Sequence, residues 1–285
     1  MKNIFYTFCL LWGATLFAEV SIEKKEVNVT TPVSAGEEMK LEVSQPETKT
    51  LTSATRGDIK VIEASENIRY LSQKIVKEYL FSYKNPEKAE VKKSLNKTLN
   101  KLNNDLMIIA TTTKDTDTKD ILEFLAYSKD QIEQIFNEKT DEEKAALMLD
   151  YSETLLEGAD SIASAHMYDF SEEEKMLMVT KEMEYLLERI TKYYMALHVG
   201  FNNDINKEQM QESITKLEEN IVQINNYTYP AEFQKVLVKM NESWKANKSF
   251  FDQSETLFIP KLMFTSVDYM EDVVVQIALH HSKNQ

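Results

Sequence analysis

Cysteine, glycine and proline are scarce in this chain, and each shortage narrows the possible folds and sites. The only cysteine, Cys9, lies inside the first apolar run, so the rest of the chain has no thiol for a disulfide, a thiolate metal site or covalent haem attachment. Five glycines and five prolines in 285 residues are few for sheets joined by many tight turns. The scarcity favours a helical protein that is stabilised by packing.

Long apolar runs are confined to the N-terminus. After the basic Lys2, an apolar stretch from Ile4 to Phe17 ends at Ala18, and an acidic segment follows. This pattern is typical of a secretory signal peptide, so we expect residues 1–18 to be removed and the protein to be periplasmic or secreted. An uncleaved membrane anchor is the alternative, although the stretch is shorter than the roughly 20 residues of a spanning helix.

Positive charges are outnumbered, with 33 Lys and Arg against 47 Asp and Glu. The net charge is −14, and the predicted signal peptide contributes one lysine and no acid, so its removal makes the balance more negative still. Nucleic-acid binding depends on clustered Lys and Arg that neutralise phosphates. We therefore expect no nucleic-acid partner, and anionic membrane surfaces are disfavoured for the same reason.

The apolar pattern becomes helical after a polar segment. Residues 19–55 lack a sustained apolar period and are interpreted as a flexible polar tether. Beyond them, apolar residues return every three or four positions, which places them on one helix face. One such stripe is formed by Leu95, Leu99, Leu102, Leu106 and Ile109. We expect about eight helices, over residues 57–84, 87–112, 118–138, 141–167, 172–200, 206–227, 230–252 and 255–281.

Start signals separate these helices. Asn85-Pro86-Glu87 offers a capping side chain, a proline suited to the first helical position and an acid. Residues 140–143 (TDEE) and 171–174 (SEEE) match the capping-box pattern. Tyr229-Pro230 indicates a further start.

The second half of the chain repeats features of the first. Tyr70-Leu71 recurs as Tyr185-Leu186, and Lys77 recurs as Lys192, at the same separation of 115 positions. His166 recurs as His281 at that separation too. We interpret the chain as two tandem antiparallel four-helix bundles from an internal duplication, over residues 56–168 and 171–282.

Two segments carry a resemblance to a known family. Residues 68–77 (IRYLSQKIVK) resemble the first helix of the PilJ-type sensory domain of type IV pilus chemotaxis transducers, with its Arg-x-Leu-Ser-Gln-Arg run. Residues 151–159 (YSETLLEGA) resemble its last helix. The similarity covers about residues 62–166, with a more diverged copy over 177–281. It implies a periplasmic four-helix sensory module related to nitrate-sensing domains.

The resemblance also implies a ligand site. Arg69 takes the anion-facing position, with Ser72 and Gln73 beside it. Lys74 replaces the second arginine of the family pattern, and Glu184 stands in the second copy where Arg69 stands in the first. These departures leave the first copy as the candidate anion site.

Arg69 also has a purely structural interpretation. Glu66 lies three residues earlier on the same predicted helix, where an exposed ion pair contributes only a few tenths of a kcal/mol. Arginine nevertheless suits bidentate anions better than lysine does. Both interpretations stay open at this level.

Metal, cofactor and catalytic sites have little support. His166, His280 and His281 fall at predicted helix ends, where a cation complements the helix C-terminus, although with nearby methionines they also suit a copper site. Runs of acids sit at helix starts, where negative charge is locally stabilising. No phosphate-binding loop, nucleophile elbow or zinc-protease motif occurs. We expect no enzyme, no bound metal and no cofactor.

These observations lead to two hypotheses. The first is an exported sensory-accessory or ligand-binding protein that recognises a small anion or a partner protein, such as a membrane sensor or pilus component, with a homodimer as one possible assembly. The second is a structural scaffold or assembly factor without a small-molecule ligand.

Overall fold

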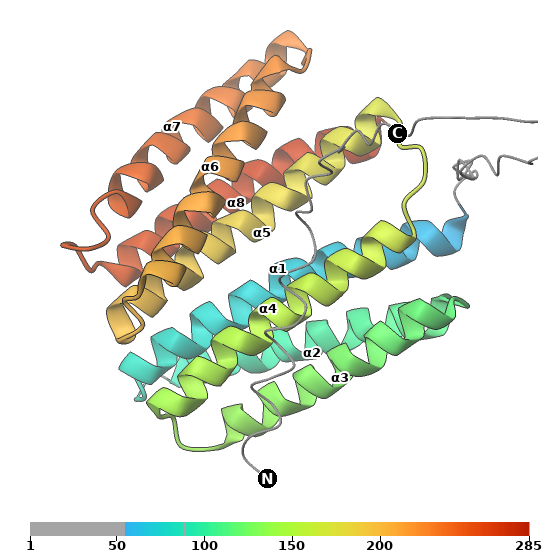
Figure 1. Cartoon of the computed structure of the whole chain (residues 1–285). Helices are drawn as coiled ribbons and strands as arrows, with labels where there is room; N and C mark the ends of the chain where they lie inside the picture. Colours follow the sequence, from blue (N-terminus) through green and yellow to red (C-terminus); the bar gives the residue numbers. More distant parts are fainter. Residues whose placement is uncertain (1–54, 88, 285) are drawn as a thin grey trace, which may run out of the picture. The chain divides into compact units, whose positions relative to one another are not determined.

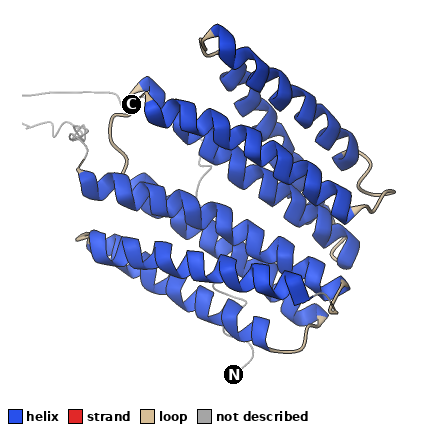
Figure 2. Cartoon of the chain, turned by 180° about the vertical axis from the view of Figure 1, so that it is seen from behind, coloured by secondary structure: helices blue, strands red, loops and turns tan. Residues whose placement is uncertain are grey.

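The computed structural model describes residues 55–87 and 89–284, and within them it contains eight α-helices, one short 3-10 helix and no strand (Figures 1 and 2). The prediction of an all-α fold is confirmed. The predicted signal peptide and, apart from Thr55, the predicted tether lie outside the described residues. None of the described helices combines the length and the apolar character that crossing a bilayer requires.

The helices follow the predicted order closely. Their bounds are α1 Arg56–Lys84, α2 Ala89–Thr112, α3 Thr116–Asn137, α4 Glu142–Ala165, α5 Glu172–Val199, α6 Asp204–Asn226, α7 Gln234–Phe251 and α8 Pro260–Lys283, with the 3-10 helix at Ala231–Phe233 before α7.

The helices pack in two groups that meet through their first helices. In the first helix group, α1 contacts α2 and α4, while α3 packs on α4 and α2; in the second, α5 contacts α6 and α8, and α7 packs on α8. Consecutive helices run in opposite directions (Figure 1). The contact between α1 and α5, called the joint below, connects the groups, and one continuous apolar core extends through both.

Two predicted start signals are wrong in detail. Asn85 ends α1 instead of starting α2: its backbone N–H donates to Ser82 O and its side chain to Phe81 O, and α2 begins only at Ala89. An amide side chain can satisfy the last carbonyls of a helix as well as the first N–H groups of the next. In α4 the capping residue is Asp141 and not the threonine before it.

One capping box is confirmed and another was missed. Ser171 accepts from the backbone N–H of Glu174, whose side chain accepts in return from the Ser171 N–H. Thr55 and Asp58 form the same reciprocal pair at the start of α1. Both boxes satisfy N–H groups that have no partner inside the helix.

The last helix begins later than predicted. Residues 252–259 connect α7 to α8, and Tyr194 of α5 holds the end of this segment by donating to Leu257 O and accepting from the Ile259 N–H. Pro260 then takes the first turn of α8, where its fixed φ and missing N–H are tolerated. The apolar periodicity could not predict this start, because the start depends on the contact of Tyr194 with the segment between α7 and α8.

In each helix group, a histidine at the end of the last helix contacts an acid at the start of the first helix. His166 Nδ1 lies 2.8 Å from Asp58 Oδ1, and its Nε2 lies 3.1 Å from Thr118 Oγ1. His281 Nδ1 lies 2.5 Å from Glu173 Oε2 in the second group. The histidines occupy helix ends as predicted, but each also ties the last helix of its group to an acid at the start of the first.

The Asp58–His166 contact predicts an acid-dependent loss of stability. Hydrogen bonds from His166 and Thr55 lower the pKa of Asp58 below its usual range. A lowered folded-state pKa gives stability that is complete above the unfolded pKa of about 3.9 and is lost as pH falls through the folded value. Asp58→Asn should therefore lower the urea midpoint at pH 6, and the difference from wild type should shrink towards pH 3.

The control for this experiment is Asp117→Asn, which alters an exposed acid in the first turn of α3. It should change the midpoint little at either pH. An Asp58→Asn difference that stays constant down to pH 3 would contradict the role given to the contact.

Candidate functional site

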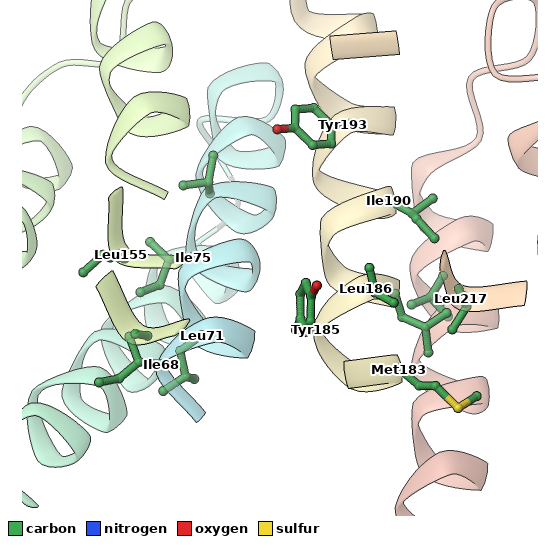
Figure 3. Close-up of a cluster of buried hydrophobic side chains, with 14 of the residues drawn as sticks. Ile68, Leu71, Ile75, Leu155, Met183, Tyr185, Leu186, Ile190, Tyr193 and Leu217 are labelled. Atoms are coloured by element: carbon green, nitrogen blue, oxygen red, sulfur yellow. The ribbon is translucent and has the colours of Figure 1, made fainter. Parts of the chain in front are cut away.

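The joint brings α1 and α5 together side by side and in the same direction. The contacts advance together along both helices: the Arg69 guanidinium lies 4.3 Å from the Tyr185 ring centroid, and Lys74 Nζ lies 2.8 Å from Glu188 Oε1. Figure 3 shows Tyr185 between the two helices, while Leu186 and Ile190 point away from α1 into the second group. The central helices therefore bury one face in their own group and another against each other.

Arg69 lies at the joint and is held by two carboxylates. Its Nη1 donates to both oxygens of Glu66 at 2.9 Å, and its Nη2 lies 3.5 Å from Asp160 Oδ1 on α4. Glu66 is only 4% exposed. The pair with Glu66 is thus buried, unlike the solvated pair weighed from the sequence.

Burial dominates the electrostatics of this pair. Loss of water raises the pKa of Glu66, and Arg69 offsets only part of that effect. Asp160 and Glu182 raise the pKa of Glu66 further. For Arg69, burial acts to lower the pKa, but Glu66 and Tyr185 more than compensate, so the guanidinium keeps its charge.

A cavity of about 300 Å³, which we call the Arg69 hollow, opens beside this arginine between α1, α4 and α5. Six apolar residues form much of its wall: Ile62, Ala163, Met167, Phe170, Met178 and Val179. The charged residues on its lining are Glu66, Arg69, Asp160, Lys175 and Glu182. A cavity of this size is at the lower end of the range for small-molecule sites.

The other two predicted site residues do not border the Arg69 hollow. Ser72 Oγ donates to the Arg69 carbonyl at 2.7 Å. Gln73 Nε2 donates to Ser72 Oγ at 3.0 Å and to the Ser152 carbonyl of α4 at 3.3 Å. Both side chains are buried. Their hydrogen bonds stabilise α1 and its contact with α4 instead of lining the hollow.

A buried ionic cluster lies further along the joint. Glu188 of α5 is fully buried and contacts Lys74 Nζ at 2.8 Å and Lys77 Nζ at 2.6 Å. Burial would raise the pKa of Glu188, but the two ammonium groups lower it overall. Glu271 of α8 accepts from Tyr70 at 3.2 Å, and its pKa is raised by burial and by Glu188.

A second ionic cluster joins α5 to α4. Glu153 pairs with Lys192 and, at 2.7 Å, with Arg189. Lys192 is fully buried and also donates to Ser152 Oγ at 3.1 Å. Burial lowers its pKa to about 8, against the opposing effect of Glu153. A buried ammonium needs a partner of this kind to keep its charge.

Several of these residues were missed by the sequence analysis, and a signal for some of them existed. Residues 185–196 (YLLERITKYYMA) are apolar on more than one side, which indicates a helix enclosed by others. Glu188 and Lys192 interrupt that surface, and charges there must be paired when buried. No comparable signal marks Asp160 or Glu182, because acids of this kind occur throughout the chain.

The described residues offer no group of three or more His, Asp and Glu side chains placed to hold a metal ion. The side chains of His166 and His281 are each engaged by a carboxylate. What the joint presents chemically is a charged, apolar-walled hollow next to two paired ionic clusters.

Comparison with protein-family models, with curated proteins and with solved structures finds no significant match to this chain. The resemblance to the PilJ-type sensory domain therefore stays a prediction.

Glu188 provides a test of the ionic cluster. Replacing it with alanine leaves Lys74 and Lys77 without their partner in the joint, and removal of one partner from a buried pair costs about 3–5 kcal/mol. Glu188→Ala should lower the free energy of unfolding by that amount in urea titrations.

The matched control is Glu219→Ala, which removes the acid of the exposed Lys216–Glu219 pair on α6. Exposed pairs contribute about 0–1 kcal/mol. A Glu188→Ala cost no larger than that of the control would show that the cluster does not hold the joint.

Proposed function

We propose that this chain is an exported, non-enzymatic sensory-accessory protein that binds a small ligand in the Arg69 hollow and passes its state to a partner protein. The observation that carries this proposal is an arginine, held by a buried carboxylate, on the lining of an apolar-walled cavity where two helix groups meet. A membrane sensor or a pilus component is the partner that the predicted family relationship favours.

Internal duplication is part of the proposal, and paired contacts support it. Asp58–His166 in the first group has its counterpart in Glu173–His281, with both members shifted by 115 positions. Asn67 donates to Asp105 at 3.3 Å, and the pair shifted by the same amount has the donor and acceptor exchanged, because Asn220 donates to Glu182 at 2.9 Å. Contacts that recur in one register are what a duplicated unit would retain.

On this proposal the joint corresponds to the interface of a dimer whose subunits have been fused. The proposed duplication makes α1 and α5 counterparts; they lie in parallel, and each is the first helix of its group (Figure 1). The residue equivalent to Arg69 is Glu184, which pairs with Lys181. The two halves would thus supply one arginine-containing site instead of two.

A small anion would have to compete with Glu66 for Arg69. Protonation removes the charge of Glu66 and leaves the guanidinium with only its longer contact to Asp160, so anion binding should become stronger as pH falls towards the raised pKa of Glu66. The substitution Glu66→Gln reproduces the neutral form at any pH.

The scaffold hypothesis keeps one specific observation in its favour. On α3, Phe124 and Tyr127 are 59% and 49% exposed, although they are large hydrophobic residues one turn apart. On α8, Leu262 and Tyr269 are similarly exposed. If a protein partner binds these faces, the chain needs no small ligand. Its melting temperature should then not respond to small molecules.

The ligand proposal predicts a thermal response that depends on Glu66 and Arg69. With nitrate, nitrite or acetate at about a hundred times its dissociation constant, binding should stabilise the protein by about 2.7 kcal/mol, or several degrees in melting temperature. Glu66→Gln should strengthen the response at pH 7, and Arg69→Gln should abolish it.

The control variant is Glu184→Gln, at the position in the second group that corresponds to Arg69. It should leave the response unchanged. If none of the anions moves the midpoint of wild type or Glu66→Gln, or if Arg69→Gln responds like wild type, a small anion is not the ligand of this site.

A further inference from the structure

The charges around the Arg69 hollow suit a ligand that also carries a positive charge better than they suit a bare anion. Three carboxylates line it, those of Glu66, Asp160 and Glu182, against the cations of Arg69 and Lys175. The lining therefore carries an excess of one negative charge. A ligand with only negative charge would meet this excess in a partly desolvated site, where Coulomb interactions are stronger than in water.

Arg69 still has a donor to offer. Its Nη1 is taken by Glu66, and its Nη2 is 3.5 Å from Asp160, which is too long for a strong hydrogen bond. Its Nε is buried and has no hydrogen-bond partner among the described residues. A buried N–H group without a partner is unusual in folded proteins. A carboxylate in the hollow would accept from Nη2, whose only ionic contact among the described residues is the long one with Asp160.

The acids on the lining also retain capacity for a cation. The side chain of Asp160 is 58% exposed, and among the described residues its one ionic contact is the long one with Arg69. Glu182 accepts from the Asn220 amide at 2.9 Å and forms no ion pair among the described residues. Both acids line the same hollow as the arginine.

The wall between these charges is apolar. Ile62 and Ala163 are buried there, and Met178 and Val179 of α5 are half-buried on the opposite side. Met side chains adapt to irregular apolar groups. A ligand that fills the hollow needs an apolar part in addition to its charges.

We propose that the Arg69 hollow binds a small zwitterion, in which a carboxylate meets Arg69, an ammonium group meets Asp160 and Glu182, and an apolar chain contacts Met178 and Val179. A free amino acid with an apolar side chain is the simplest molecule of this class. The proposal rests on the proposed function, because it specifies the ligand of the same site.

Three matched probes separate the charge requirements. L-leucine carries both charges, leucinamide keeps only the ammonium group, and N-acetyl-L-leucine keeps only the carboxylate. In calorimetric titrations of the full chain at pH 7, L-leucine should bind at least about tenfold more tightly than either analogue, since each lost ion pair in a desolvated site is worth about 1.4 kcal/mol or more.

Charge-neutral variants assign each end of the ligand. Asp160→Asn should weaken the binding of L-leucine and leucinamide by a similar factor and should not weaken that of N-acetyl-L-leucine. Arg69→Gln should weaken the binding of L-leucine and N-acetyl-L-leucine and should not weaken that of leucinamide. Asp272→Asn, which alters an exposed acid on α8, is the control and should change none of the three affinities. Helical circular dichroism and the urea midpoint report whether each variant is folded.

The outcomes distinguish this inference from the proposed function. If L-leucine and N-acetyl-L-leucine bind equally well, or if L-leucine does not bind, the proposal of a zwitterionic ligand is wrong. If nitrate or acetate then stabilises the protein in an Arg69-dependent way, the ligand site survives with a different ligand. If neither the anions nor the leucine probes bind, both proposals fail.

Discussion

The requirement that a buried charge be paired determines how the two helix groups meet. Lys77 and Lys192 are almost completely buried, and each lies on a helix that also supplies the apolar core of its group. Lys77 finds its carboxylate on the other group, at Glu188. Lys192 finds its carboxylate at Glu153, which is on the other group as well. Because each lysine depends on an acid of the other group, Lys77 and Glu188 fix the register of α1 against α5, while Lys192 and Glu153 tie α5 to α4.

That register places the Arg69 hollow. The same alignment that sets Lys74 and Lys77 against Glu188 brings Arg69 over Tyr185, nearer the start of α1. The hollow is then bounded by residues of three helices, and none of them alone could form it. The charges left unpaired on its lining are therefore set by how the joint forms.

The helices could be predicted because their signal is local, whereas the joint could not. Periodicity and capping residues gave the order of the helices and most of their bounds, and Ser171 marked the start of α5 correctly. Asn85 misled because one amide can serve either of two helix ends. Arg69 could be selected from its sequence context, but its contacts with Asp160 and Tyr185 depend on the packing of separate helices. The same limitation explains why Ser72 and Gln73, its neighbours in sequence, face a different part of the structure.

The start of α8 shows how one side chain can connect distant parts of a helical chain. No side chain of the adjoining segment caps this helix, and the N–H of Ile259 just before it is bonded instead to the Tyr194 hydroxyl, 65 residues earlier. An N-terminal turn stabilised in this way cannot nucleate by itself during folding, because its hydrogen-bond acceptor arrives only with α5. The C-terminal helix should therefore complete its first turn late, after α5 has docked, and its last turns should be able to form earlier than its first.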